Sequence, residues 1–137
     1  MSYEFNGAKL ILFDEGRIVC LLRDDIPTIS WPNHWDFPGG GREGNETPVE
    51  CALRELYEEL NVALPAAAIH WQRRFTNPDK PDSWLLAAEL PSQARDQLRL
   101  GDEGQAFDWM LPTEYIAHPR AIPALSQRLA VYMEEHC

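Results

Sequence analysis

The sequence predicts an α/β domain in which helices cover a β-sheet. Five segments rich in β-branched, aliphatic and aromatic residues are typical of strands: 8–13, 17–22, 68–75, 83–90 and 104–111. Two further segments, 47–61 and 122–136, carry apolar residues at the three- and four-residue spacing of amphipathic helices. A sheet has to bury its apolar face against another layer, and helices of this length can form that layer.

The first two strands are predicted to form a hairpin. Residues 8–13 and 17–22 are nearly continuous apolar runs, which is typical of strands covered on both faces. Asp14–Gly16 between them has the composition of a tight turn. A polar, proline-bearing loop follows at 23–41, and a loop of this length indicates a functional role.

The helix predicted after this loop has clear start and stop signals. Thr47 is a good N-cap, Pro48 suits the first helical position, and Glu50 completes a capping box. Asn61 can adopt the left-handed conformation that ends many helices. The expected buried stripe consists of Val49, Ala52, Leu53, Leu56 and Leu60.

Length, charge and cysteine content limit the possible classes of protein. The 137 residues fit one domain spanning 1–137. A formal net charge of −10 argues against an extended nucleic-acid partner and against an anionic membrane surface. No apolar run or N-terminal signal segment indicates membrane insertion or secretion. Cys20, Cys51 and Cys137 lack C-x-x-C spacing, so we expect reduced thiols in a cytoplasmic protein.

Three glutamates of the predicted helix crowd into one arc. On a helical wheel, Glu55, Glu58 and Glu59 fall within about 100° of each other, beside the apolar stripe. Arg54 precedes Glu58 by four residues and can pair with it. Charge runs of this kind often form only a solvated face. However, the glycines Gly39–Gly41 precede the helix, and clustered carboxylate oxygens match the ligands that Mg²⁺ and Mn²⁺ prefer.

The segment 40–62 resembles the Nudix box, the signature of the Nudix hydrolases. That signature is a glycine, five residues, a glutamate, seven residues, then Arg-Glu-aliphatic-any-Glu-Glu-any-Gly-aliphatic. The residues that match it in register are Gly40, Glu46, Arg54, Glu55, Leu56, Glu58, Glu59 and Val62. Asn61 stands where the pattern has glycine, and asparagine is the next-best residue for a left-handed cap.

The resemblance implies a fold and an activity. The fold would be a three-layer α/β/α sandwich around a mixed β-sheet. The activity would be Mg²⁺-dependent hydrolysis, with Mn²⁺ as a possible substitute, of the pyrophosphate linkage in a small nucleoside di- or triphosphate or a nucleoside diphosphate derivative. Oxidised-purine nucleotides and ADP-ribose are alternative substrates, and a non-catalytic nucleotide sensor is an alternative function. Either a monomer or a homodimer fits the family, and the acidic charge disfavours RNA-end processing.

The resemblance also implies residue roles. The metal ligands would be the carboxylates of Glu55, Glu58 and Glu59 with the carbonyl of Gly40. Arg54 would orient these acids and Glu46 would support the loop. Glu103 would approach the metal or activate water, with Asp102 as the alternative. In substrate binding, Gly39, Gly40 and Gly41 would present backbone groups, Arg23 would meet a phosphate or remain exposed, and Trp35 would stack on the base or pack in the core.

Overall fold

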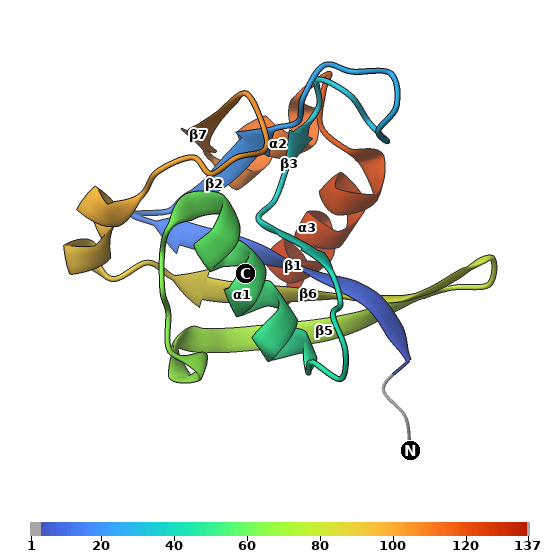
Figure 1. Ribbon diagram of the computed structural model, residues 1–137, viewed down its shortest axis with the longest axis horizontal. Helices are drawn as coiled ribbons and strands as arrows, with labels where there is room; N and C mark the ends of the chain where they lie inside the picture. Colours follow the sequence, from blue (N-terminus) through green and yellow to red (C-terminus); the bar gives the residue numbers. More distant parts are fainter. Residues whose placement is uncertain (1–3, 137) are drawn as a thin grey trace.

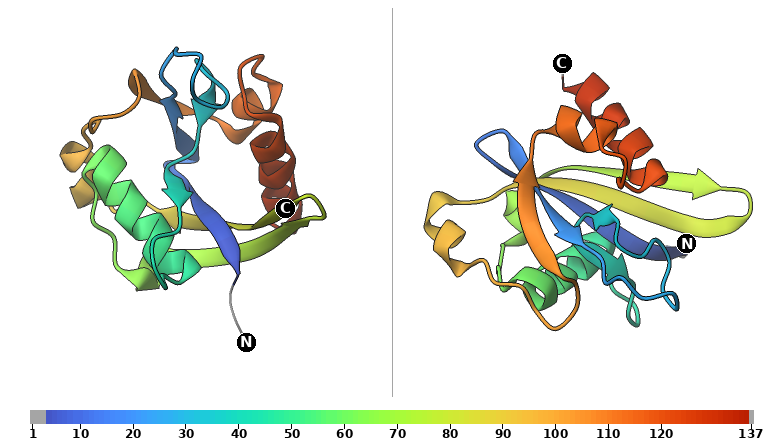
Figure 2. Two further views of the ribbon diagram at one scale, coloured as in Figure 1. Left: turned by 45° about the vertical axis from the view of Figure 1, so that its right-hand side comes forward. Right: turned by 90° about the horizontal axis from the view of Figure 1, so that it is seen from above.

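The computed structural model describes residues 4–136 and contains a seven-stranded sheet. The strands are β1 (Phe5–Asp14), β2 (Arg17–Leu22), β3 (Trp35–Asp36), β4 (Gly39–Gly41), β5 (Ile69–Asn77), β6 (Lys80–Glu89) and β7 (Ala106–Met110). Helix α1 (Pro48–Leu60) covers one face, while α2 (Pro112–Ala117) and α3 (Pro123–Glu135) cover the other (Figures 1 and 2). Strands β1 and β6 are parallel and the other pairs antiparallel, so the three-layer sandwich around a mixed sheet is confirmed.

Strand β1 is the centre of this arrangement. Along one edge it pairs with β6 over nearly its whole length. Its other edge is divided: β4 pairs with residues 7–9, whereas β2 pairs only with Phe13 and Asp14. Strand β2 then continues into pairing with β3 and β7. The short glycine strand β4 is thereby placed beside β1 and against α1.

Two hydrophobic clusters fill the spaces on either side of the sheet. Alternate residues of β1 enter each cluster, so Leu10 and Leu12 face α1, whereas Ile11 and Phe13 face α2 and α3. Both of the first two strands are buried over most of their length. The prediction that they are covered on both faces is therefore confirmed.

Helix α1 begins and ends as its residue pattern predicts. The backbone N–H of Glu50 donates to Thr47 Oγ1 at 3.1 Å, and that of Thr47 donates to Glu50 Oε1 at 2.8 Å. Asn61 has φ 63° and ψ 26°, the left-handed conformation. The buried face differs slightly from the predicted stripe, because Val49 and Leu53 are only half-buried. Its fully buried members are Pro48, Cys51, Ala52, Leu56 and Leu60.

The remaining differences concern short elements and one hairpin. The predicted turn at 76–82 is shorter than expected, because β5 and β6 continue until Asn77 pairs with Lys80. The predicted loop at 23–41 contains the short strands β3 and β4. Helix α2 and the 3₁₀ segments Ala66–Ala68 and Ser92–Gln97 were not expected, since such short elements lack a periodic pattern. Within residues 4–136, no helix is long and apolar enough to cross a membrane.

Candidate metal and nucleotide site

Arg54 of α1 forms hydrogen bonds to the first part of the Nudix box. Its Nε donates to Glu46 Oε2 at 2.6 Å, and its Nη2 donates to Glu46 Oε1 at 3.1 Å and to the carbonyl of Gly41 at 2.9 Å. This two-pronged contact is the main reason that the pKa of Glu46 is lowered and that of Arg54 raised. The loop before α1 is therefore held in one position relative to the helix.

Arg54 also lies against two of the crowded acids. Its Nη1 donates to Glu58 Oε1 at 3.1 Å and lies 3.8 Å from Glu55 Oε1. The carboxylate of Glu55 rests on the backbone of Gly40, where a Cβ would lie only 2.2 Å from Glu55 Oε2. Burial is the main reason that the pKa of Glu55 is raised. A side chain at position 40 would therefore displace the carboxylate of Glu55.

Glu59 is half-buried and only partly compensated. Its Oε1 accepts a 2.7 Å hydrogen bond from the backbone N–H of Gly39. Burial nevertheless raises the pKa of Glu59 to about 7, and the nearby charges of Glu55 and Asp36 act in the same direction. The hydrogen bond from Gly39 and the charge of Lys9 oppose this increase. A bound cation would favour the ionised form of this carboxyl group.

The chemistry of these donors fits a hard divalent cation. Glu55, Glu58 and Glu59 offer carboxylate oxygens, which Mg²⁺ and Mn²⁺ prefer over thiol or imidazole ligands. Within the described residues, no three acidic, cysteine or histidine side chains already converge on one point. Glu58 is held by Arg54, and Glu59 by the N–H of Gly39. Each of these hydrogen bonds uses one carboxylate oxygen, and an ionised carboxylate can offer its other oxygen to a cation.

The backbone carbonyl that the box resemblance implies as a ligand belongs to Gly40, and this carbonyl has close neighbours. The carbonyl oxygen of Gly40 accepts from Cys51 Sγ at 3.5 Å and would lie 2.4 Å from a Cβ on Gly7. The carbonyl oxygen of Gly39 instead accepts from Lys9 Nζ at 3.0 Å. Lys9 is close enough to lower the pKa of both Glu55 and Glu59. The carbonyl of Gly39 thus shares Lys9 as a partner with Asp36, whereas the carbonyl of Gly40 lies against Cys51 and Gly7.

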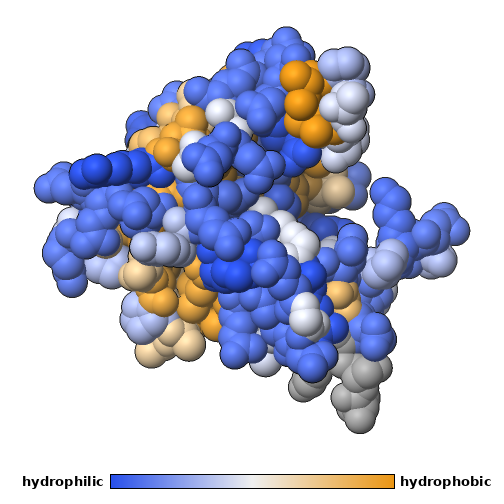
Figure 3. Space-filling model, in the orientation of Figure 1, coloured by the Kyte–Doolittle hydropathy of each residue, from blue (hydrophilic) through white to orange (hydrophobic). Residues whose placement is uncertain are grey.

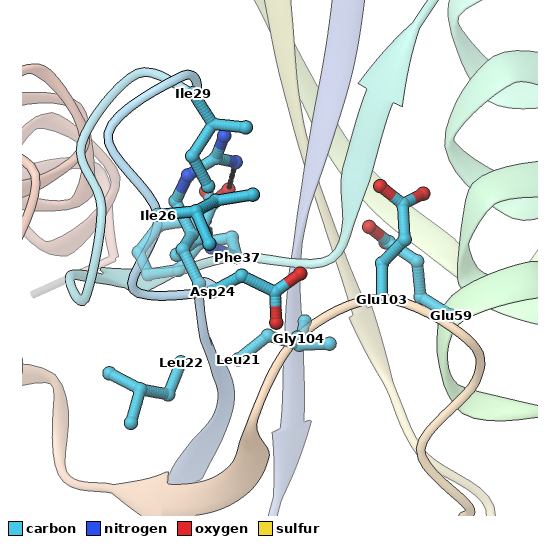
Figure 4. Close-up of a pocket in the computed structure, with 11 residues that line it drawn as sticks. Leu21, Leu22, Asp24, Ile26, Ile29, Phe37, Glu59, Glu103 and Gly104 are labelled. Carbon is cyan, nitrogen blue, oxygen red and sulfur yellow. Dashed lines mark hydrogen bonds and ion pairs between the residues drawn. The ribbon is translucent and has the colours of Figure 1, made fainter.

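The loop that carries Glu103 docks onto the C-terminal end of α1. The last carbonyls of a helix have no partner within it. Here the N–H of Gly101 donates to the carbonyl of Glu59 at 2.8 Å, and the N–H of Arg99 donates to that of Leu60 at 3.0 Å. Glu59 and Glu103 consequently point into the same cavity (Figure 4). Asp102 is exposed and is not among the residues that line this cavity.

A buried aspartate with two basic partners lines both this cavity and a second cleft beside β4. The side chain of Asp36 is 7% exposed, and its Oδ2 accepts from Lys9 Nζ and from Arg23 Nη1, both at 3.0 Å. The Nε of Arg23 donates to the carbonyl of Ser30 at 2.8 Å. Arg23 therefore lines the cavity that Glu59 and Glu103 enter, whereas Lys9 and Asp36 were not predicted from the sequence. A lone lysine in the apolar run 8–13 was the signal that could have drawn attention to Lys9.

Trp35 is not brought to the site. Its backbone carbonyl accepts from the hydroxyl of Tyr115 at 2.7 Å, and its ring meets His118 edge-on at 6.4 Å. The side chain packs against the cluster beneath α2 and α3. Trp31, which is 45% exposed, lines the cleft beside β4 instead. The geometry favours the packing role for Trp35.

The fold and the site together describe an α/β/α protein in which acidic side chains of a helix lie near basic side chains that could bind phosphate. The family model described as the NUDIX domain matches residues 5–130, and the chain therefore belongs to the Nudix family.

Three known proteins are similar to this chain in sequence or in fold. An RNA pyrophosphohydrolase of Halorhodospira halophila is 36% identical over 73 residues, covering 50% of this chain and 37% of that protein. The chain thus spans little more than a third of that relative's length. The MutT protein of Methanosarcina mazei has a TM-score of 0.75 at 17% identity, covering 95% and 93% of the two chains. A bifunctional NMN adenylyltransferase/ADP ribose pyrophosphatase of Francisella tularensis, complexed with AMP and a Mn ion, has a TM-score of 0.73 at 20% identity, covering 98% and 42%.

Proposed function

We propose that the chain is a Mg²⁺-dependent pyrophosphohydrolase of small nucleotides. The observation that carries this proposal is that Glu59 of the box, Glu103 and Arg23 line one cavity. The charge of Lys9 acts on both Glu55 and Glu59 beside it. Negative ligands for a metal and positive partners for phosphate are both needed for phosphoryl chemistry. Membership of the Nudix family and a relative named as a pyrophosphohydrolase support the same reaction.

The proposed cation ligands are the carboxylates of Glu55, Glu58 and Glu59 and the carbonyl of Gly39, with Glu103 as a further ligand. When bound, a divalent cation would neutralise the charge of the substrate phosphates and lower the pKa of a water molecule coordinated to it. Mn²⁺ is the proposed substitute for Mg²⁺, because both favour oxygen ligands. The Mn ion in the structurally similar bifunctional enzyme is consistent with this choice.

The side chains of the protein have separate proposed roles. Arg23 and Lys9 are fixed by Asp36 and donate to the substrate phosphates. Glu103, which lies beside Glu59 in the cavity, accepts the proton of the attacking water. Arg54 does not contact the substrate and acts by holding Glu46, Glu55 and Glu58 in position.

The proposed substrate is a nucleoside di- or triphosphate or a nucleoside diphosphate derivative. ADP-ribose and RNA 5′ ends enter as candidates through the names of a structural neighbour and a relative. Oxidised purine nucleotides are also candidate substrates. A nucleotide sensor without catalysis is less well supported, because every acidic position of the box is filled. We further propose one domain over 1–137, acting in the cytoplasm as a monomer or homodimer.

A substrate panel tests the proposal. Purified protein is incubated with Mg²⁺ and nucleoside triphosphates, oxidised purine triphosphates, ADP-ribose and 5′-triphosphorylated RNA, and the released phosphate, pyrophosphate or nucleotide is identified. We expect Mg²⁺-dependent cleavage of a pyrophosphate linkage in at least one small nucleotide. Tight nucleotide binding without any cleavage would favour the sensor instead, and cleavage confined to RNA would exclude the small-nucleotide assignment.

A further inference from the structure

A basic cleft lies beside the proposed metal site. It has a volume of about 370 Å³ and opens between β4, the β5–β6 hairpin, the start of α3 and the loop that carries Trp31. Four basic side chains and one acidic side chain line it: Lys9, Arg23, Lys80, Arg128 and Asp36. The chain as a whole has a formal net charge of −10. The cleft therefore concentrates positive charge in an otherwise acidic molecule.

Arg128 is the basic side chain that most needs an anionic partner. It is half-buried, its Nη1 donates to Ser83 Oγ at 2.8 Å, and its guanidinium lies 4.8 Å from the centre of the Phe75 ring. Within residues 4–136, no carboxylate lies within ion-pair distance of it, whereas Arg73 and Arg74 on the neighbouring hairpin both have such partners. Burial consequently lowers the pKa of Arg128. A desolvated cation facing a cleft is costly until an anion offsets its charge.

The position of Arg128 determines how far apart two anionic groups of one ligand must be to reach both Arg128 and the glycine strand β4. Ser83 pairs with Gly7, and Gly7 pairs with Gly41 in the glycine strand. The backbone of Ser83 is therefore about 10 Å, or two strand spacings, from the backbone of Gly41. A ligand that reaches both places needs a spacer between its anionic groups, and a nucleoside provides one.

We infer that Arg128, assisted by Lys80, binds a second phosphate of the substrate: a phosphate monoester on the ribose, remote from the scissile pyrophosphate. The inference rests on the proposed function, because it places the pyrophosphate at Glu55 and Glu59. A neutral base would leave the charge of Arg128 uncompensated, whereas a phosphate monoester brings nearly two negative charges and three acceptor oxygens. The exposed ring of Trp31 offers a stacking surface for the base. The substrate class is thus a nucleoside diphosphate derivative that carries a 2′- or 3′-phosphate.

Binding calorimetry in the presence of Mg²⁺ tests this inference without turnover. Nucleoside 5′-monophosphates of the four bases are compared with the matched 3′,5′- and 2′,5′-bisphosphates, none of which contains a pyrophosphate linkage. We expect at least one bisphosphate to bind about tenfold or more tightly than its monophosphate, as a charge-assisted hydrogen bond allows. The isomer with the larger preference identifies the position of the second phosphate.

Substitutions test whether the preference for bisphosphates over monophosphates depends on the cleft. Arg128→Gln is expected to remove most of it, and Lys80→Gln, at an exposed position on the hairpin, to reduce it without loss of core packing. Arg74→Gln removes an equal charge from the same hairpin outside the cleft and should leave the preference unchanged. If Arg128→Gln does not fold, Arg128→Lys and Lys80→Gln take its place.

Two results would overturn the inference: equal affinity for mono- and bisphosphates of every base, or a preference that persists in the Arg128 and Lys80 variants. The catalytic proposal fails separately. Absence of turnover on the substrate panel, together with a bisphosphate preference that depends on Arg128, would reject catalysis and retain the second-phosphate site.

Discussion

At the scale of single residues, the crowded glutamates of α1 are tolerated because each has a different partner. Glu58 is exposed and paired with Arg54, Glu55 rests on Gly40, and Glu59 accepts from the N–H of Gly39. Burial still raises the pKa of both Glu55 and Glu59, and the charges of neighbouring acids act in the same direction. In the absence of a cation, proton uptake relieves the remaining repulsion.

This proton uptake predicts how stability responds to pH and metal. The folded protein holds a proton on Glu59 up to about pH 7, whereas the unfolded chain releases it near the ordinary value of 4.5. The stabilisation from Glu59 is thus fully present below about pH 4.5 and is lost as pH rises through about 7. Divalent cations bind the ionised carboxylate, so their stabilising effect should increase over the same range.

We therefore expect Mg²⁺ to raise the melting temperature more at pH 8 than at pH 6. Differential scanning calorimetry with Mg²⁺ or with EDTA at each pH measures this difference. The Glu59→Gln variant, which does not titrate at this position, is the control and should show a weaker pH dependence. An increase in melting temperature that is equal or smaller at pH 8 would contradict the assignment of Glu59 as a ligand.

At the scale of elements, the C-terminal end of α1 joins the helix to the loop that carries Glu103. Asn61 ends the helix in the left-handed conformation, and its Nδ2 donates to the carbonyl of Gln97 at 3.1 Å. Two further N–H groups of this loop satisfy the final carbonyls of the helix. The helix end therefore positions Glu103, an acid from outside the box, beside Glu59 within it.

The backbone conformation of Asn61 predicts a difference between two substitutions. Both Asn61→Ala and Asn61→Gly remove the hydrogen bond to Gln97, but only glycine adopts a positive φ without steric cost. We expect the alanine variant to be less stable than the glycine variant by about 1 kcal/mol. Urea unfolding of the two variants measures this difference, and equal stability would show that the left-handed cap has no energetic role.

Close packing of the loop against α1 predicts an effect of Gly101 on catalysis. A Cβ at this position would lie 2.3 Å from the carbonyl oxygen of Glu58, so Gly101→Ala should displace the loop. We expect Gly101→Ala and Glu103→Gln each to lower kcat by about 100-fold if Glu103 is the base. The double variant should be little worse than either single variant, because both act through Glu103. Additive losses would indicate that Gly101 acts through another part of the site.

At the scale of the whole molecule, the sheet brings distant segments to one edge of α1. Lys9, Asp36 and Glu103 come from β1, β3 and the loop before β7, yet all three lie around the acids of the box. The view in Figure 3 shows a mainly hydrophilic surface with small separate apolar groups, as expected for a chain with a net charge of −10. The basic side chains beside β4 are therefore local features of an acidic molecule.

The sequence predicted those features that depend on neighbouring residues. The capping box at Thr47, the left-handed Asn61 and the acidic arc of α1 all follow from spacing within one helix. The ion pairs of Asp36 could not be predicted, because Lys9 is 27 residues away and meets it only through the sheet. The direction of the Gly40 carbonyl depends in the same way on contacts with Gly7 and Cys51.

The most direct test compares two isosteric substitutions on the same helix. Glu59→Gln removes a proposed cation ligand, whereas Glu50→Gln keeps the hydrogen-bonding pattern of the capping box and lies outside the acidic arc. With a substrate from the panel and saturating Mg²⁺, we expect Glu59→Gln to lower kcat/KM by more than about 100-fold with an unchanged circular dichroism spectrum, and Glu50→Gln to retain activity. Full activity in Glu59→Gln, or equal losses in both variants, would contradict a catalytic metal site on α1.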